Sequence, residues 1–240
     1  MKKGSQKPTQ AKILPFTKSN GKKAIDLYNK TGRKAQKWQT DLTRQILAIN
    51  KEGLYVHTKV GYSIPRRNGK NEIIAIRELY ALFNSEKVLH TAHRTTTSSS
   101  AARRLSEMLD ALGYIEVQRP KKGQTYEKGY VFAKQFGLER IQLLTENGGK
   151  VDFRTRTSKG GLGEGFDVLI IDEAQEYTED QESSLKYVVS DSKNPQIIMC
   201  GTPPTMVSSG TIFPKYRKDT LEGKNIDSLW AEWSVPEETD

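Results

Sequence analysis

The sequence predicts an α/β fold with a mostly parallel sheet flanked by helices. An alternating run over 54–64 leads through a short turn into an apolar-periodic helix over 69–83. A strand over 87–92 and a helix over 101–112 repeat this order, which is the βαβα progression of a parallel sheet. A further short apolar run, which begins at Asp167, has the composition of a strand that is buried on both faces.

Length and composition favour one main domain, because 240 residues can bury a single α/β core. No apolar run approaches the roughly 20 residues of a membrane span, and the lysine-rich N-terminus lacks the apolar segment of a secretory signal. We therefore expect a protein that is neither secreted nor membrane-bound. Cys200 is the only cysteine, which excludes an intrachain disulfide and a cysteine-cluster zinc site, and we expect it in the core.

Positive charge is concentrated at the N-terminus. The chain has a formal net charge of +9, and residues 1–37 contain eleven basic residues against one acidic residue, so they carry +10 and the remainder carries −1. Such a segment is typical of a flexible tail that binds nucleic acid. We expect residues 1–35 to form a basic flexible arm, with a merely solubilising terminus as the alternative.

The turn 63–71 has the features of a phosphate-binding loop. Gly69 permits close approach of a ligand to the backbone, the next amides lie at a helix N-terminus, and Lys70 adds a mobile cation. The match to the pattern G-x-x-x-x-G-K-[ST] is imperfect, because Ile64 stands at the first glycine and Asn71 replaces the Ser/Thr. A basic turn before an ordinary helix is the alternative.

Two carboxylates, Asp172 and Glu173, end the apolar run that begins at Asp167. A strand of this kind is the usual partner of a phosphate loop, since one carboxylate holds magnesium and the next orients the attacking water. The two motifs together predict nucleotide hydrolysis.

Two further motifs extend this interpretation. The Gln39 amide can read an adenine edge, and Trp38 can pack on the base or brace the loop, although an amphipathic helix start with a buried tryptophan has the same pattern. Thr202 ends a strand expected over 196–204, where a hydroxyl can sense the γ-phosphate; a simple turn forced by two prolines is the alternative.

The remaining segments suggest connecting structure. Residues 140–145 and 151–155 flank a glycine turn and predict a hairpin, and the glycine-dense stretch 158–165 predicts a loop. We expect a turn over 95–100 and a helix over 178–190. The three histidines lack metal-ligand spacing, so we expect structural roles for them; they are His57, His90 and His93.

In order and spacing, these motifs resemble the large terminase subunit of tailed bacteriophages, the ATPase that drives double-stranded DNA into an empty procapsid. The resemblance covers about residues 36–235 and implies a P-loop NTPase of the additional-strand (RecA-like) type with a glycine-rich hairpin insertion. It implies that Lys70 holds the β- and γ-phosphates, that Glu173 activates water and that Thr202 couples hydrolysis to movement. The implied cofactors are ATP and Mg²⁺. The implied nucleotide-binding residues are Trp38, Gln39, Arg66, Arg67, Asn68, Gly69, Lys70, Asn71 and Thr202, with Arg66 as the phosphate-loop arginine and with Asn71 and Asp172 at the magnesium.

The resemblance also implies an organisation and a set of partners. We expect an ATPase domain over 36–230, and over 231–240 the start of a linker to a nuclease domain that this chain lacks. The implied partners are double-stranded DNA, the portal protein and the small terminase subunit. The chain is expected in the host cytoplasm and transiently on the procapsid, as a homo-oligomeric ring, a pentamer, when docked on the portal and as a monomer in isolation.

A terminase ring implies an arginine finger supplied in trans from the segment before the carboxylate strand. Arg154 and Arg156 are the candidates, because their equal parity on a strand would let both project from one face. Lys159 could act only as a point charge. The alternatives are a solvated strand face without function, or Arg66 acting in cis.

Two other functions remain open. A helicase-like remodelling ATPase would share the phosphate loop and the carboxylates, but it needs a second motor domain. A non-catalytic DNA-binding module with a decayed phosphate loop is favoured by Asn71 and disfavoured by Lys70, Asp172 and Glu173. Magnesium-dependent ATP turnover would separate these functions.

Overall fold

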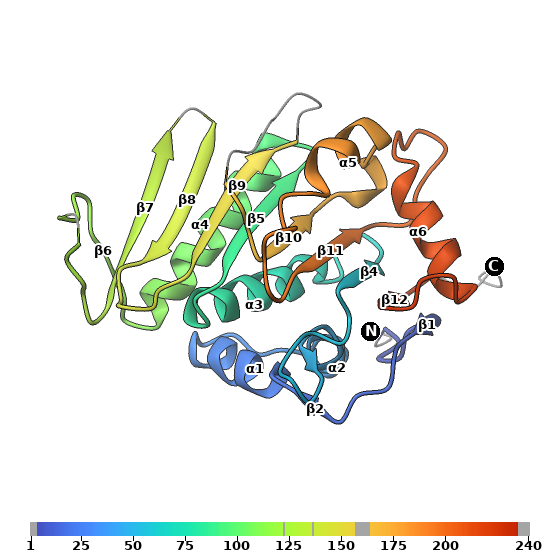
Figure 1. Cartoon of the computed structure of the whole chain (residues 1–240), viewed down its shortest axis with the longest axis horizontal. Coiled ribbons are helices and arrows are strands. Elements are labelled where there is room, and N and C mark those ends of the chain that lie inside the picture. The colour runs from blue at the N-terminus through green and yellow to red at the C-terminus, as the bar shows by residue number, and fades with distance from the viewer. Residues whose placement is uncertain (1–3, 122, 136, 157–163, 235–240) are drawn as a thin grey trace.

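The computed structural model describes residues 4–121, 123–135, 137–156 and 164–234. Most strands belong to one ten-stranded sheet (Figure 1). Its strands are β1 (Gln10–Lys12), β4 (Lys59–Ser63), β5 (Lys87–Ala92), β6 (Ile115–Glu116), β7 (Gly129–Gln135), β8 (Leu138–Leu143), β9 (Lys150–Thr155), β10 (Val168–Ile171), β11 (Gln196–Gly201) and β12 (Ser228–Glu232). A second sheet pairs β2 (Lys18–Ser19) with β3 (Ala48–Ile49). The helices are α1 (Gly21–Lys30), α2 (Lys37–Ile46), α3 (Lys70–Phe83), α4 (Thr95–Ala111), α5 (Glu179–Leu185), α6 (Ile212–Leu221) and the short 3-10 helix η1 (Ala174–Glu176).

The centre of the large sheet is parallel. Its strand order is β1-β12-β4-β11-β10-β5-β9-β8-β7-β6, and the six strands from β12 to β9 run in the same direction. β11 lies between β4, which leads into the phosphate-loop motif, and β10, which ends in the carboxylates. The intervening strand confirms the predicted α/β fold of the additional-strand type.

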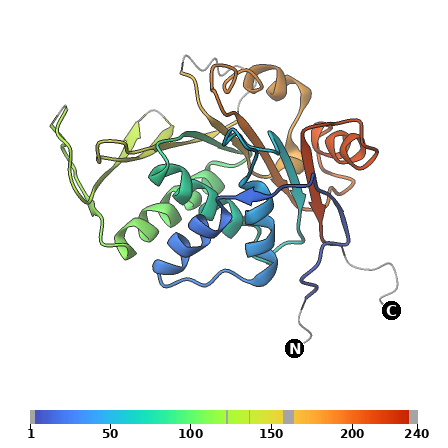
Figure 2. The ribbon, with the colours of Figure 1, turned by 60° about the horizontal axis from the view of Figure 1, so that its bottom comes forward.

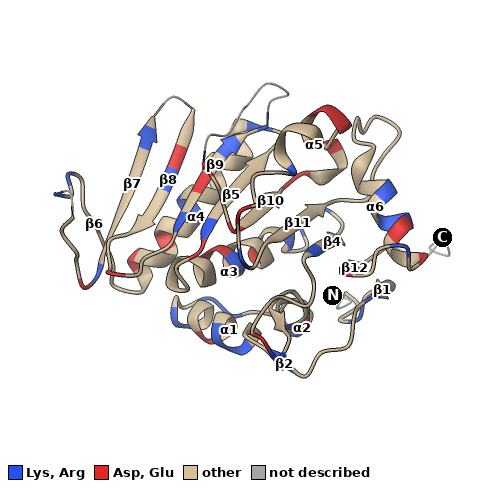
Figure 3. Ribbon diagram, in the orientation of Figure 1, with Lys and Arg blue, Asp and Glu red and all other residues tan. Residues whose placement is uncertain are grey.

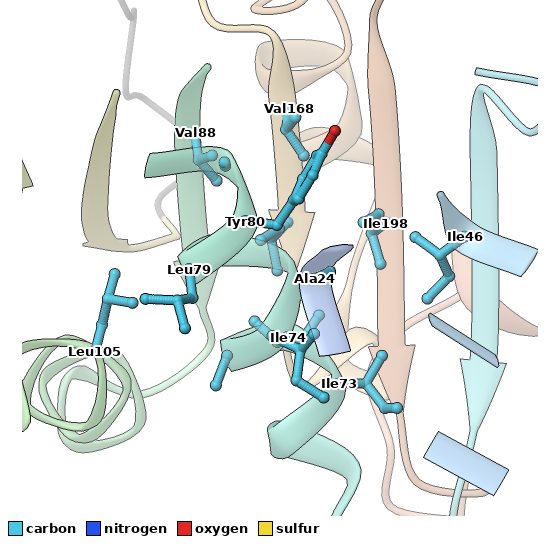
Figure 4. Packing of buried hydrophobic residues seen from close by; sticks show 14 of the residues in the cluster. Ala24, Ile46, Ile73, Ile74, Leu79, Tyr80, Val88, Leu105, Val168 and Ile198 are labelled. Carbon is cyan, nitrogen blue, oxygen red and sulfur yellow. The ribbon is translucent and has the colours of Figure 1, made fainter. Parts of the chain in front are cut away.

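Helices cover both faces of the parallel strands (Figure 2). Along β10, Val168 and Ile170 belong to the core beneath α1 to α4, whereas Leu169 and Ile171 belong to the core beneath α5 and α6. This alternation follows from the two-residue period of a strand. Figure 4 shows the first core, where Ile74 and other α3 side chains pack among residues of β5, β10 and β11.

Residues 10–35 are folded, so the expectation of a flexible arm is wrong for this segment. β1 pairs antiparallel with β12, and α1 packs on α2 and α3. The buried α1 residues Ala24, Ile25 and Tyr28 lie on one helical face, and this burial outweighs the high local charge. The main domain therefore begins before residue 36.

The C-terminal boundary also differs from the prediction. β12 pairs with β4 on one side and with β1 on the other, so Ala231 and Glu232 belong to the main sheet and not to a linker. Residues 235–240 lie outside the described residues. None of the described helices has the length and apolar composition that crossing a bilayer requires.

The predicted hairpin is confirmed as β8 and β9, which pair antiparallel. β9 also pairs in parallel with β5, so the hairpin continues the main sheet. The predicted turn over 95–100 is wrong, because these residues form the first turns of α4, where the Ser100 hydroxyl donates to the Thr96 carbonyl. α5 ends at Leu185, earlier than predicted, and most of the glycine-dense stretch, 158–163, lies outside the described residues.

Candidate nucleotide-binding site

A cleft of about 920 Å³ lies at the carboxyl ends of the parallel strands. Residues from the phosphate-loop motif, the carboxylate pair and the β11 tip all line it, which brings together motifs more than 100 residues apart in the sequence. A crevice at the carboxyl ends of parallel strands is the usual ligand site of open α/β sheets.

The phosphate-loop motif forms the turn between β4 and α3. Arg67 and Gly69 have left-handed φ values of 64° and 79°, and α3 begins directly after Gly69. The Asn68 side chain donates to the carbonyls of Pro65 (3.2 Å) and Arg66 (3.0 Å), which closes the turn. The N-terminus of a fourteen-residue helix thus faces a cleft with exposed arginines beside it, an arrangement that suits phosphate.

Lys70 pairs with Asp172 across the floor of the cleft, with 2.5 Å between Nζ and Oδ1. The same oxygen accepts from the Glu173 amide at 2.7 Å and from the Cys200 thiol at 3.2 Å. Burial opposes the charged form of Asp172, but the Lys70 ammonium overcomes it and lowers the pKa of the carboxyl. Burial also raises the pKa of Cys200, which keeps the thiol protonated and able to donate.

A buried pair that the sequence did not indicate lies behind Asp172. His90 on β5 contacts Glu78 on α3, with 2.5 Å between Nδ1 and Oε1, and both side chains are only 1% exposed. The other ring nitrogen of His90 is 4.0 Å from Asp172 Oδ2. His90 therefore has the expected structural role, and it lies beside Asp172, the candidate magnesium ligand. This contact depends on how α3 packs on β5, which the sequence does not show.

Glu173 lies at the rim of the cleft in a left-handed conformation, with φ 53° and ψ 46°. Its Oε2 accepts a hydrogen bond from the backbone amide of Arg94 at 3.0 Å. A non-glycine residue in this region costs free energy, so the surrounding contacts must hold it.

Arg156 supplies much of that support, which corrects the expectation that its side chain projects from a strand face. The guanidinium is buried and donates to the carbonyls of Thr91 (3.1 Å), Asp172 (2.5 Å) and Glu173 (3.1 Å). β9 ends at Thr155, so strand parity no longer sets the direction of the Arg156 side chain. Arg154 remains half-buried on β9, 3.7 Å from the Asp152 carboxylate.

Trp38 and Gln39 lie behind the phosphate loop. The Gln39 amide nitrogen donates to the Gly69 carbonyl at 3.2 Å, and its oxygen accepts from the Gln36 amide at 2.8 Å. The Trp38 ring packs against Trp233 with 5.2 Å between centroids. The pair braces the loop from behind, which is one of the two roles considered for it; contact with adenine stays a prediction.

Thr202 follows β11 and lines the cleft. Its backbone amide donates to the Gln175 side chain at 3.2 Å, which ties the β11 tip to the turn after β10. A side chain at Gly201 would approach Gln175 Oε1 to 2.9 Å, so the neighbouring glycine permits this contact. The sequence did not indicate Gln175, because the bond depends on the pairing of β10 with β11.

The donor set at the floor fits magnesium bound together with a phosphorylated ligand. Among the described residues there is no cluster of three or more His, Cys, Asp or Glu that could enclose a metal by itself. Magnesium in nucleotide sites usually keeps several waters and takes one or two protein oxygens plus phosphate oxygens. Asp172 and the Asn71 amide both line the cleft and can supply such oxygens.

Comparison with known proteins agrees with this geometry at the level of fold. No family model and no curated protein matches the sequence. The structure matches the HK97 bacteriophage large terminase with a TM-score of 0.72 and 13% identity, over 93% of this chain and 46% of that one. This chain has the fold of a phage large terminase ATPase domain. It spans about half the length of the HK97 large terminase.

Two further terminases share the fold. The ATPase domain of the Thermus phage P74-26 large terminase matches with a TM-score of 0.54 and 13% identity, over 79% of this chain and 71% of that one. The large terminase of another thermophilic bacteriophage, in complex with ADP, matches with a TM-score of 0.52 and 13% identity, over 74% of this chain and 40% of that one.

Proposed function

We propose that this chain is the ATP-hydrolysing motor portion of a phage large terminase, which powers translocation of double-stranded DNA into the procapsid. The observation that carries the proposal is the Lys70–Asp172 pair, 2.5 Å apart on the floor of the cleft, with Glu173 directly beside it. A cation for phosphate, a carboxylate for magnesium and a second carboxylate for water are the groups that phosphoanhydride hydrolysis requires.

We infer that the Lys70–Asp172 pair separates when ATP binds. With ATP bound, Lys70 would turn from Asp172 to the β- and γ-phosphates, and Arg66 and Arg67, which belong to the loop and line the cleft, would lie near enough to contact them. The Asp172 carboxylate, freed from Lys70, would hold magnesium together with the Asn71 side chain. Bound magnesium neutralises charge on the phosphate oxygens.

Glu173 is proposed to orient and activate the attacking water. The Arg94 amide fixes the direction of its carboxylate, and Arg156 fixes the turn that carries it. A base held in place before substrate arrives needs little reorganisation during the reaction. Because Arg156 is engaged within its own chain, Arg66 in cis is the candidate to meet charge on the γ-phosphoryl group.

The partners follow from the same proposal. Double-stranded DNA is the translocated substrate, and the portal protein and the small terminase subunit are docking partners. The working assembly is a ring, a pentamer on the portal, in the host cytoplasm.

Thr202 is proposed to couple loss of the γ-phosphate to movement, through the hydrogen bond between its backbone amide and the Gln175 side chain.

Glu173→Gln tests this function. ATP turnover with magnesium is expected to fall by about 10²-fold or more, because the amide lacks the basicity to polarise water, while affinity for ATPγS is retained. Glu179→Gln on the exposed start of α5 is the matched control and should keep parent turnover. Parent-rate turnover by Glu173→Gln would refute the assignment, and no magnesium-dependent turnover by the parent would favour the non-catalytic DNA-binding module.

A further inference from the structure

The basic N-terminal segment has a defined shape in this fold. Residues 18–37 contain seven basic residues and one acidic residue, a net +6 out of +9 for the chain. They form β2, α1, the loop to α2 and the first residue of α2, and Figure 3 shows their basic positions gathered at the lower edge of the molecule. The basic side chains of this segment are therefore attached to a folded helix and loop and not to a disordered tail.

Helical periodicity separates the charged and buried faces of α1. The buried residues occupy one side, whereas Lys22, Lys23 and Lys30 are exposed on the opposite side. Lys23 and Lys30 are seven residues apart, so they lie almost in line with a rise of about 10 Å between them. Lys34 continues the exposed row into the loop after α1.

Part of the charge on this surface is left without a partner. Lys22 pairs with Asp26 at 2.6 Å, and Arg33 lies 3.7 Å from the Glu72 carboxylate. Lys23, Lys30 and Lys34 make no ion pair with any residue that the structure describes. Duplex DNA carries about one negative charge per 1.7 Å of its axis, so a helix of ten residues, about 15 Å long, faces several phosphates.

We propose that α1 and the loop to α2 form a docking surface for the phosphate backbone of duplex DNA, with Lys23, Lys30 and Lys34 as the principal contacts. The choice of duplex DNA among polyanions rests on the proposed function. Backbone contacts of this kind carry no sequence information, which suits a protein that moves along DNA of any sequence.

The surface is connected to the phosphate-loop helix. The Tyr28 hydroxyl, on the buried face of α1, donates to Glu72 Oε2 at 2.6 Å. Glu72 lies two residues after Lys70 and lines the nucleotide cleft, and Arg104 of α4 is 3.5 Å from its other oxygen. A shift of α1 on DNA can therefore reach the first turn of α3 through this hydrogen bond, in addition to the Arg33–Glu72 ion pair and the packing of α1 on α3. If DNA on α1 changes the affinity for nucleotide at α3, then nucleotide must change the affinity for DNA by the same factor.

The surface is tested without nucleotide, so its failure is distinguishable from failure of the ATPase assignment. The probe is a duplex of about 30 base pairs, and the readout is the slope of log K against log salt. Combining Lys23→Gln, Lys30→Gln and Lys34→Gln should reduce the magnitude of the slope by about 2.7, at about 0.9 per phosphate contact. The control combines Lys186→Gln, Lys193→Gln and Lys218→Gln, exposed lysines elsewhere with the same total charge change, and should leave the slope near the parent value.

Equal slopes for the two triple variants would overturn the proposal, as would absence of duplex binding by the parent at low salt. Tighter binding of the parent to single-stranded RNA or to anionic phospholipid vesicles than to duplex DNA would also overturn it. If the first triple variant fails to fold, the single variants Lys23→Gln and Lys30→Gln should each reduce the slope by about 0.9.

The connection has its own test. In the parent, duplex DNA should change the affinity for ATPγS, and Tyr28→Phe, which deletes only the hydroxyl, should diminish that change while leaving the DNA salt slope as in the parent. An undiminished effect of DNA in Tyr28→Phe would overturn the connection through the Tyr28–Glu72 hydrogen bond.

Discussion

The two sides of the candidate nucleotide-binding cleft are built differently. On the phosphate side, Arg66 and Arg67 are exposed, and the loop is tied to its surroundings chiefly through the Gly69 carbonyl and Lys70. On the carboxylate side, the turn from Asp172 to Glu176 is cross-linked by the buried Arg156 guanidinium, by the Arg94 amide and by Gln175.

This difference separates two requirements of phosphoryl transfer. The groups that activate water must be oriented before the substrate arrives, since reorienting them during the reaction raises the barrier. The groups that bind phosphate can instead take their final positions when the ligand binds. On the proposed function, the carboxylate side is already organised in the free chain, and we expect the phosphate side to change partners when nucleotide binds.

The largest effect on stability is expected from removing Arg156, the buried cation that holds the carboxylate side. Arg156→Ala leaves three backbone carbonyls without their charged donor and should lower the free energy of unfolding by about 3 kcal/mol or more. Urea denaturation measures this change. Arg154→Ala on the half-buried neighbour is the control, with an expected loss below about 1 kcal/mol; equal losses would show that Arg156 does not organise the turn.

On the phosphate side, Lys70→Met keeps the apolar stem but removes the charge. It leaves the buried Asp172 without its cation, and the chain should lose about 3 kcal/mol of stability without nucleotide. Affinity for ATPγS should fall as well, as titration calorimetry would show. Retained affinity would mean that Lys70 does not contact phosphate.

A pH titration sharpens the comparison further. The pKa of Asp172 is lower in the folded chain than the 3.8 of an unperturbed carboxyl, so its stabilising contribution is complete above that value. The contribution is lost as pH falls through the lowered folded-state pKa of about 2. Stability should therefore decline over this acid range, and less steeply in Asp172→Asn. Identical slopes for the two chains would contradict the pairing.

The smallest effect is expected at the brace behind the phosphate loop. Gln39→Ala removes the hydrogen bond to the Gly69 carbonyl and should cost about 1 kcal/mol of stability. If Gln39 only braces the loop, affinities for ATP and GTP fall by the same factor. If it also reads adenine, ATP loses more than GTP. Competition binding with both nucleotides separates these outcomes.

The elements predicted well are those whose signals are local. Around Lys70, the apolar periodicity of the strand and helix and the glycine-lysine turn between them all fall within about 30 residues. The strand before Asp172 is a short apolar run. Burial on both faces and the parallel direction follow from such patterns.

The contacts that hold the site depend on sheet register, which the sequence alone does not determine. Arg156, His90 and Gln175 act across strands or between a strand and a helix, on residues 12 to 65 positions away. The folded state of α1 was missed for a different reason. Its lysine density suggested a solvated tail, but three buried side chains on one face are enough to anchor a ten-residue helix.

Hydrogen exchange of backbone amides with and without magnesium and ATPγS tests the contrast between the two sides most directly. We expect fast exchange over residues 66–71 in the free chain and strong protection on binding, whereas residues 172–176 should exchange slowly in both states. Slow exchange over 66–71 before nucleotide is added, or protection that appears at 172–176 only after binding, would contradict this contrast.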